Sequence, residues 1–210
     1  ACSSVDSLWT TVDTLDVEFG DPLAANFESC SLDGFVAQGG AISISNDAFE
    51  GSCALSMLHL EGDAPLNFYP ADVLAGRGVY RVMARANDVT SENGIELLAG
   101  DGLSDSGISI SLRPNGTEDP GISIAGLGLD AVADATMELG DWYEVEVVLG
   151  EASIHLSIDG ADVISAPLPE DLPAAGRIKL WSTSSSSYDN LTYQPENPCP
   201  VVERYRRNFH

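Results

Sequence analysis

Apolar and polar residues alternate with a period of two over most of this chain. The pattern is clearest in four blocks of the C-terminal half, each closed by a Gly, Asp-Gly or Ser turn signal. Because successive side chains of a strand point to opposite faces, the alternation predicts antiparallel strands with one face in a core and one in water. The four blocks are residues 142–149, 153–158, 176–181 and 188–193.

The same parity assigns the side chains of each predicted strand to an inner or an outer face. The inner set is apolar, and the outer set holds five of the six basic residues that precede the C-terminal tail. The predicted core residues are Tyr80, Val82, Ala84, Ile95, Leu97, Ile108, Ile110, Leu112, Val145, Val147, Ile154, Leu156, Ile158, Ile178 and Leu180. The predicted outward residues are Arg81, Met83, Arg85, Glu96, Ser109, Ser111, Arg113, Glu144, Glu146, His155, Arg177, Lys179 and Trp181.

The remaining segments complete a single all-β domain, which the length of 210 residues favours. Residues 61–76 are expected to form a loop with a helical turn at 71–75, and residues 131–137 a short helix or a loop. We divide the chain into an N-terminal extension (1–25) packed on the sandwich, a β-sandwich (26–193) and a basic tail (194–210). The further predicted strands are residues 15–19, 41–45, 53–58, 78–86, 94–99, 107–113 and 121–125.

The charge balance is strongly acidic, with 33 Asp and Glu residues against 9 Lys and Arg and a formal net charge of −24. Such a surface disfavours nucleic acid and anionic membranes as partners and favours cations. The alternative is a solvated acidic coat that serves solubility alone. No run of about 20 apolar residues is present, so the sequence predicts no membrane span.

The tail has the opposite charge, because Arg204, Arg206 and Arg207 lie among the last seven residues. This contrast is typical of a segment that docks on an acidic neighbour, so copies of the chain itself are possible partners.

Four cysteines lack the C-x-x-C pairing of zinc and redox sites, and their even number predicts two disulfides in an oxidising compartment. Three pairings are possible. We favour Cys30–Cys53, between neighbouring strands, and Cys2–Cys199, which joins the chain ends. The start at Ala1 suggests that a signal peptide has been removed, so we expect a secreted, extracellular or cell-surface protein.

Several short motifs resemble the jelly-roll domains of the concanavalin A-like lectin/glucanase and carbohydrate-binding-module type. The resemblance covers residues 26–193 and implies a two-sheet antiparallel β-sandwich, a fold that carries lectins, binding modules, structural subunits and glycanases. The matching segments are N-F-E at 26–28, D-G-F at 33–35, G-S-C-A-L at 51–55, W-Y-E-V at 142–145, D-G at 159–160, G-R-I-K-L at 176–180 and D-N-L at 189–191.

Relatives of this type hold sugars on the outer face of a sheet, which makes Arg85, Arg113, Trp181 and Glu96 the candidate ligand-binding residues. Planar charged groups bind hydroxyls in pairs, and aromatic rings stack on the apolar faces of sugars. The alternative is that each arginine pairs with an acidic neighbour across the sheet. Trp142 is expected in the core, where the family keeps a structural tryptophan.

The resemblance also implies a structural calcium ion held near the chain ends. The matching ligands are Glu28, Glu50, the backbone of Gly51, and Asp189. Calcium takes six to eight hard oxygen ligands and tolerates irregular geometry. The alternative is that these acids belong to the acidic coat.

One pair of carboxylates raises the possibility of catalysis. Glu144 and Glu146 lie about 7 Å apart on one strand face, and glycoside hydrolysis needs two carboxylates at about 5–10 Å. Glucanases of this fold carry E-x-D-x-x-E, whereas residues 144–149 read E-V-E-V-V-L, so the last acid is replaced by Leu149. Asp16 and Glu18 show that such pairs arise by chance in this acidic chain.

The preferred function is therefore a secreted, non-catalytic, carbohydrate-binding jelly roll with a structural calcium ion and a polysaccharide or glycan as partner. The second hypothesis is an extracellular filament or cell-surface subunit that assembles through protein–protein contacts. The third is a glycoside hydrolase.

Overall fold

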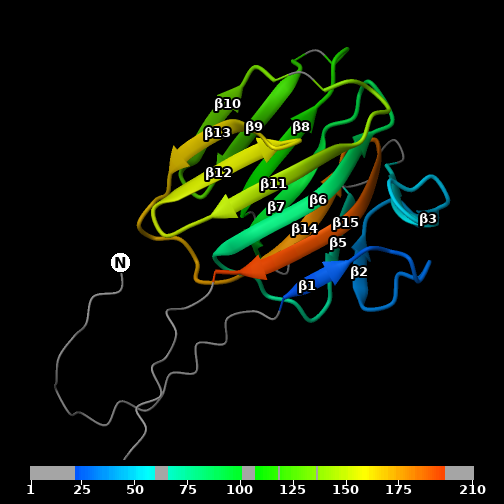
Figure 1. Ribbon diagram of the computed structural model, residues 1–210, viewed down its shortest axis with the longest axis horizontal. Coiled ribbons are helices and arrows are strands. Elements are labelled where there is room, and N and C mark those ends of the chain that lie inside the picture. The colour runs from blue at the N-terminus through cyan, green and yellow to red at the C-terminus, as the bar shows by residue number, and fades with distance from the viewer. Residues whose placement is uncertain (1–21, 60–65, 101–106, 118, 136, 197–210) are drawn as a thin grey trace, which may run out of the picture.

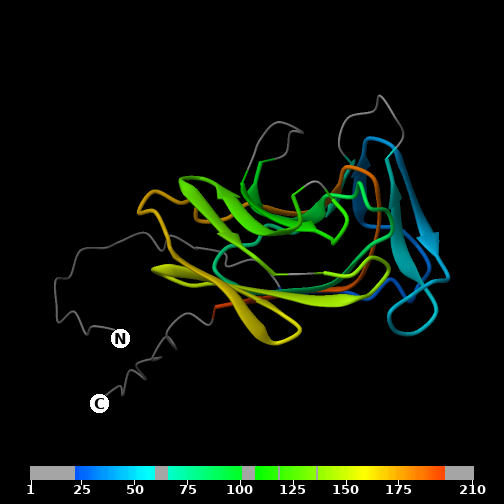
Figure 2. The ribbon, with the colours of Figure 1, turned by 90° about the horizontal axis from the view of Figure 1, so that it is seen from above.

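The computed structural model describes residues 22–59, 66–100, 107–117, 119–135 and 137–196. These residues form strands and turns, and they contain no helix of the length and apolarity needed to cross a bilayer. Two antiparallel sheets lie face to face as two layers (Figures 1 and 2). The predicted all-β, two-sheet antiparallel sandwich is confirmed.

Sheet A is the layer nearer the viewer in Figure 1. In spatial order it contains β13 (Ala161–Pro167), β12 (Ser153–Ile158), β11 (Tyr143–Leu149), β6 (Gly78–Ala86), β15 (Ser185–Pro195), β4 (Ala54–Leu58) and β3 (Ala41–Ser45), and β1 (Leu23–Ala25) pairs with β15 further along than β4.

Sheet B forms the second layer. In spatial order it contains β10 (Leu129–Ala133), β9 (Gly121–Gly126), β8 (Ile108–Arg113), β7 (Asn93–Ala99), β14 (Arg177–Ser182), β5 (Leu66–Pro70) and β2 (Phe35–Gln38). Consecutive strands cross repeatedly from one sheet to the other, so residues far apart in sequence become neighbours on each outer face.

The core lies between the inner faces of the two sheets. All fifteen core residues predicted from alternation belong to this buried cluster. Phe27, Phe35 and Phe68 extend it at the β2–β5 end, where the rings of Phe35 and Phe68 stack with centroids 4.7 Å apart. Since apolar burial is the main favourable contribution to folding, this interface determines which side chains face outward.

Several segments differ from the prediction, which also placed no strand at β1, β2 or β13. The predicted loop 61–76 contains β5, whose residues Leu66 and Phe68 are fully buried, and the predicted helical turn at 71–75 is a turn followed by a bridge between Ala75 and Gly176. The predicted helix or loop at 131–137 is wrong in its first half, which belongs to β10. The small side chains of Leu129–Ala133 give little periodic signal, and pairing with β9 decides the conformation.

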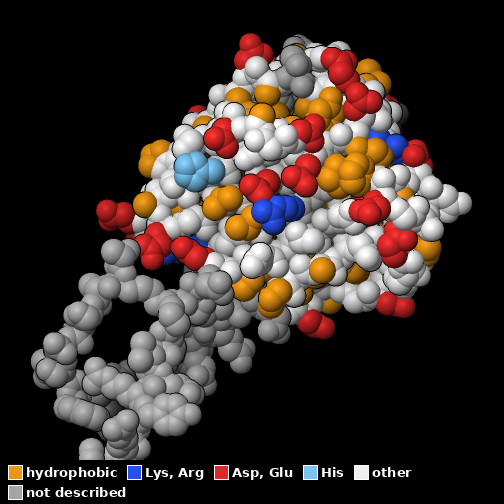
Figure 3. All heavy atoms as spheres, viewed as in Figure 1, with side chains coloured by type: hydrophobic (Ala, Val, Ile, Leu, Met, Phe, Trp, Pro, Cys, Tyr) orange, Lys and Arg blue, Asp and Glu red, His pale blue; other side chains and the backbone are white. Residues whose placement is uncertain are grey.

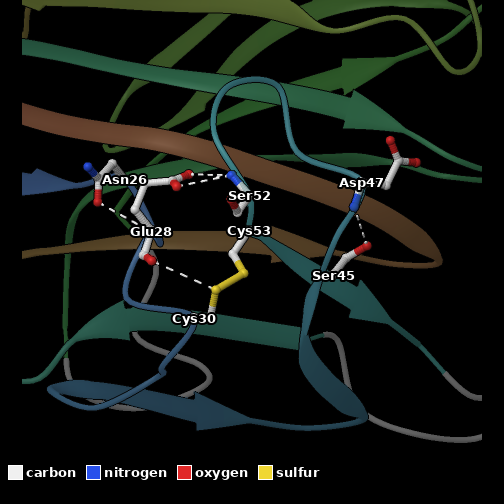
Figure 4. The surroundings of a disulfide bond; sticks show 7 residues. All are labelled: Asn26, Glu28, Cys30, Ser45, Asp47, Ser52 and Cys53. Carbon is white, nitrogen blue, oxygen red and sulfur yellow. Dashed lines mark hydrogen bonds between the residues drawn. A yellow bond between two sulfur atoms is a disulfide. The ribbon is translucent and has the colours of Figure 1, made fainter.

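The disulfide between Cys30 and Cys53 is present, as predicted, with Cα atoms 5.5 Å apart (Figure 4). It ties the segment before β2 to the residue that precedes β4. The predicted Cys2–Cys199 bond, the strand at 15–19 and the basic tail beyond residue 196 lie outside the described residues.

Replacing Cys30 and Cys53 by alanine together should lower the free energy of unfolding by about 3 kcal/mol. The bond closes a loop of 23 residues, and its removal gives the unfolded chain more conformational freedom. Urea denaturation of the double variant and the wild type measures the difference. Non-reducing peptide mapping should recover the Cys30–Cys53 peptide, and a Cys2–Cys30 peptide would contradict the assignment.

Candidate functional site

The outer face of sheet B is organised around Trp181 on β14. Trp181 lies opposite Gly94 of β7, and Gly94 lies opposite Ser111 of β8. A Cβ atom on Gly94 would come within 3.2 Å of the Trp181 ring and 1.8 Å of the Ile110 carbonyl oxygen. The close approach of the Ile110 carbonyl oxygen requires glycine at position 94, and the missing side chain leaves room for the half-buried indole beside it.

The next row of this face is polar. Lys179 lies opposite Glu96, and the backbone N–H of Gly107 donates a hydrogen bond of 2.7 Å to the Glu96 carboxylate. The Lys179 ammonium lies 6.0 Å from the centre of the Tyr69 ring, whose hydroxyl accepts a hydrogen bond of 3.1 Å from Gln38. Lys179 was expected to be exposed, but it is 1% exposed because its side chain lies among these neighbours.

Arg113 ends β8 on the same face, where it forms an ion pair of 3.3 Å with the exposed Asp119. The structure thus brings Trp181, Glu96 and Arg113 to one surface. Arg85, the fourth predicted ligand-binding residue, lies on β6 of sheet A and faces the other side of the molecule.

The outer face of sheet A carries the two predicted carboxylates of β11. Glu146 lies opposite Arg81 and forms an ion pair of 2.5 Å with it, and Glu144 lies opposite Met83. Figure 3 shows this face, with basic and acidic side chains adjoining near its middle. The alternative that arginines pair with acidic neighbours across the sheet therefore holds for Arg81, whereas Arg113 pairs with Asp119 of the turn that follows its own strand.

The same face holds Arg85 and Trp142, and here the prediction of a core tryptophan is wrong. Trp142 is half-buried on the outer face, where the Arg85 guanidinium lies 4.7 Å from the ring centre. Phe49 meets the ring edge-on at 6.1 Å. Position 142 lies just before β11 and has the same parity as the outward residues Glu144 and Glu146. The alternation rule itself would therefore have placed this ring on the outer face.

The four predicted calcium ligands come together beside the start of β4. The Glu28 carboxylate accepts hydrogen bonds of 3.0 and 3.1 Å from the Ser52 N–H (Figure 4). It lies against the Cα of Gly51, where a Cβ atom would come within 2.1 Å of it. Gly51 has a φ of +72°, so both its backbone and its surroundings require glycine.

Asp189 of β15 is fully buried beneath this loop. Its carboxylate accepts hydrogen bonds from the N–H groups of Asn190 at 2.8 Å and Glu50 at 3.3 Å. Burial raises the pKa of Asp189, the backbone hydrogen bonds lower it, and the negative charge of Glu28 raises it again. The loop therefore covers the Asp189 carboxylate, and the Glu28 carboxylate lies close enough to raise its pKa.

The carboxylate and carbonyl oxygens of this cluster are the type of ligand that a hard divalent cation binds. An ionised carboxylate has about four lone-pair sites, so the observed hydrogen bonds leave acceptor capacity on both Asp189 and Glu28. In the described part of the chain, no three His, Cys, Asp or Glu side chains lie in an arrangement that would hold a metal. Backbone oxygens and water would have to complete the coordination of a calcium ion.

No known family model matches this sequence, and no curated protein resembles it by sequence. Three solved structures illustrate the fold it shares. An apo Crh5 transglycosylase is 14% identical with a TM-score of 0.61, and 85% of each chain is covered. A prokaryotic β-1,3-1,4-glucanase (lichenase) from a mouse hindgut metagenome is 15% identical with a TM-score of 0.58, covering 83% of this chain and 99% of its own.

A carbohydrate-binding module, CBM66 from Bacillus subtilis, is 12% identical with a TM-score of 0.57, covering 77% of this chain and 96% of its own. At these identities the likeness concerns architecture. The chain has the jelly-roll fold of the concanavalin A-like glucanase and carbohydrate-binding-module type.

Proposed function

We propose that this protein is a non-catalytic glycan-binding domain whose primary site is the outer face of sheet B. The observation that carries the proposal is the half-buried Trp181 indole beside Gly94, with Glu96 in the adjoining row and Arg113 at the end of β8 on the same face. The face thus combines an aromatic ring with charged hydrogen-bonding groups on neighbouring strands.

Sugars require this combination of groups. A pyranose presents an apolar face of C–H groups and a rim of hydroxyls, so it is bound by ring stacking and by directed hydrogen bonds. Charged side chains form the stronger hydrogen bonds to such hydroxyls. On sheet B these side chains project from regular strands, which hold their positions and reduce the entropy lost on binding.

The carboxylates support binding rather than hydrolysis. On the strands near Trp181, Glu96 is the one acid of this outer face, and the residue opposite Trp181 is Gly94. Two suitably spaced carboxylates are needed for glycoside hydrolysis. The carboxylate pair predicted from the sequence, Glu144 and Glu146, lies on sheet A, and there Glu146 forms an ion pair with Arg81.

Replacing Trp181 by alanine should weaken binding to a neutral polysaccharide about tenfold, because the loss of a central aromatic contact costs more than 1 kcal/mol. Affinity electrophoresis against a panel of β-glucans, xylans and mannans identifies the ligand, and calorimetry measures the change. Glu96→Gln should also weaken binding. Arg81→Ala is the matched control, because Arg81 forms its ion pair on the opposite sheet.

Two outcomes would contradict the proposal. One is the absence of retention by every polysaccharide in the panel. The other is release of reducing sugar that disappears in Glu146→Gln, which would favour the hydrolase.

We further propose that Asp189, Glu28 and the Glu50–Gly51 backbone hold a structural calcium ion. The support is the fully buried Asp189 carboxylate with Glu28 close enough to raise its pKa. A divalent cation would offset both the cost of burial and the repulsion between the two acids. This ion would stabilise the loop between β3 and β4 and take no part in chemistry.

Calcium should raise the melting temperature, and a chelator should lower it. At free calcium of about 100 times Kd, the gain is about 2.7 kcal/mol, or about 5–10 °C for a domain of this size. Differential scanning fluorimetry in low salt measures it. Asp189→Asn should remove at least half of the response, whereas Glu151→Gln, which alters an exposed acid in the turn between β11 and β12 at the far end of sheet A, should leave it unchanged. A melting temperature indifferent to both calcium and chelator would contradict the site.

The filament or cell-surface subunit stays an alternative, supported by the contrast between the basic tail and the acidic body. Truncation after Pro200 should leave a folded monomer and abolish any assembly that sedimentation detects in the full chain. Assemblies of unchanged size after truncation would count against tail docking.

A further inference from the structure

A row of polar side chains crosses sheet A at the end of β6, on the face opposite to the proposed primary site. Arg85 lies opposite Ser187, Ser187 opposite Ser56, and Ser56 opposite Ser43. Strands in a sheet lie about 4.8 Å apart, so the row extends about 14 Å. It leads away from Trp142, which contacts Arg85 on the other side.

A shallow depression of about 590 Å³, wide open to solvent and called the hollow below, lies over this row. Hydroxyl, amide and charged groups line most of it, and Leu139 adds an exposed apolar side chain. The lining residues are Ser45, Asp47, Ser56, Arg85, Asn87, Leu139, Gly140 and Ser187. These come from β3, β4, β6 and β15 and from the adjoining turns, so the fold assembles the hollow from distant parts of the sequence.

Arg85 forms the fixed floor of the hollow. Its side chain is only 11% exposed, and its guanidinium donates hydrogen bonds to Asp47 at 2.7 Å and to Ser187 at 3.3 Å. Asn87 donates a further bond of 2.9 Å to Ser187. Within the described structure, the buried Nε of Arg85 has no hydrogen-bond partner.

Asp47 differs from Arg85 because its side chain is 70% exposed at the rim. Its contact with Arg85 lowers the pKa of Asp47, so the carboxylate stays ionised and can accept hydrogen bonds. Phe49, two residues further along the same loop, is 48% exposed and meets Trp142 edge-on. The rim therefore combines an ionised acceptor with a neighbouring guanidinium donor.

We propose that this hollow is a second, independent saccharide site that binds a neutral sugar through two adjacent hydroxyls. One hydroxyl would donate to Asp47 and the other would accept from Arg85, with the serine hydroxyls and Asn87 bonding the remaining groups. Leu139 would contact the C–H face of the ring. Because the two sites lie on opposite sheets, one molecule could bind two glycan chains.

A neutral ligand fits the charges better than an anionic one. Asp47 already balances the charge of Arg85, and the protein as a whole carries a net charge of −24, which repels anions. The many hydroxyl groups of the lining also suit a ligand with several hydroxyls that can both donate and accept.

The test uses the methyl glycosides of glucose, mannose and galactose, with glucuronate as the anionic probe. The chain has three tryptophans, and their indole N–H signals in a ¹⁵N-labelled sample, assigned with Trp142→Phe and Trp181→Phe, report the two faces separately. At least one neutral glycoside should shift the Trp142 signal with saturation, and Asp47→Asn should weaken that titration at least fivefold.

Asp119→Asn is the matched control, because it alters an exposed Asp–Arg pair of the same type on sheet B. It should leave the Trp142 titration unchanged, as should Trp181→Ala, so failure of the primary site and failure of this site are distinguishable. The proposal is overturned if no neutral glycoside shifts the Trp142 signal, if glucuronate alone does so, or if Asp47→Asn and Asp119→Asn behave alike.

Discussion

The burial of two apolar sheet faces against each other is the constraint on which the rest of this structure depends. A strand alternates its side chains strictly, so a slip of one residue would move a whole inner set into water. The outer positions are therefore determined together with the core. Val82 and Ala84 of β6 are buried, and as a consequence Arg81 and Arg85 lie on the outer face of the sheet. Both proposed binding surfaces exist because the core determines the register of the strands.

The loop between β3 and β4 adds a second constraint. Its last residues are held to the Glu28 carboxylate and to the Cys30–Cys53 disulfide, and the Glu50 N–H is bonded to buried Asp189. The same short loop presents Asp47 at the rim of the sheet A hollow and packs Phe49 against Trp142. Whatever stabilises the loop over Asp189 therefore also positions Asp47, which would contact a sugar, although the two sites share no side chain.

Alternation predicted the strands and faces well where the side chains are large. All fifteen expected core residues are buried, because Ile, Leu, Val and Tyr give a strong signal with a period of two. It was weaker at β10, where small residues follow Leu129, and at β5, which is only five residues long and ends at Pro70. There the pairing with neighbouring strands decides the conformation, and a single-sequence pattern does not contain that information.

The site could be predicted only as separate residues. Parity placed both Arg85 and Trp181 outward, but it does not say to which sheet a strand belongs. The strand order of the fold puts them on opposite sides of the molecule. Asp47 and Ser187, which meet at Arg85, carry no sequence signal of their own, since one is an acid among 33 acidic residues and the other lies in a serine run.

The distribution of charge explains how an acidic protein can still offer specific polar surfaces. On the described strands Arg81, Arg85 and Arg113 each contact one carboxylate at 2.5–3.3 Å, so each arginine is locally neutralised. The remaining acids produce a negative field at longer range, which salt screens within about 10 Å. A neutral polyol can approach through such a field without electrostatic cost, and an anion cannot. Near the surface, the directions of the donors and acceptors then decide what binds. The negative field and the paired arginines therefore favour the same class of ligand, a neutral molecule rich in hydroxyl groups.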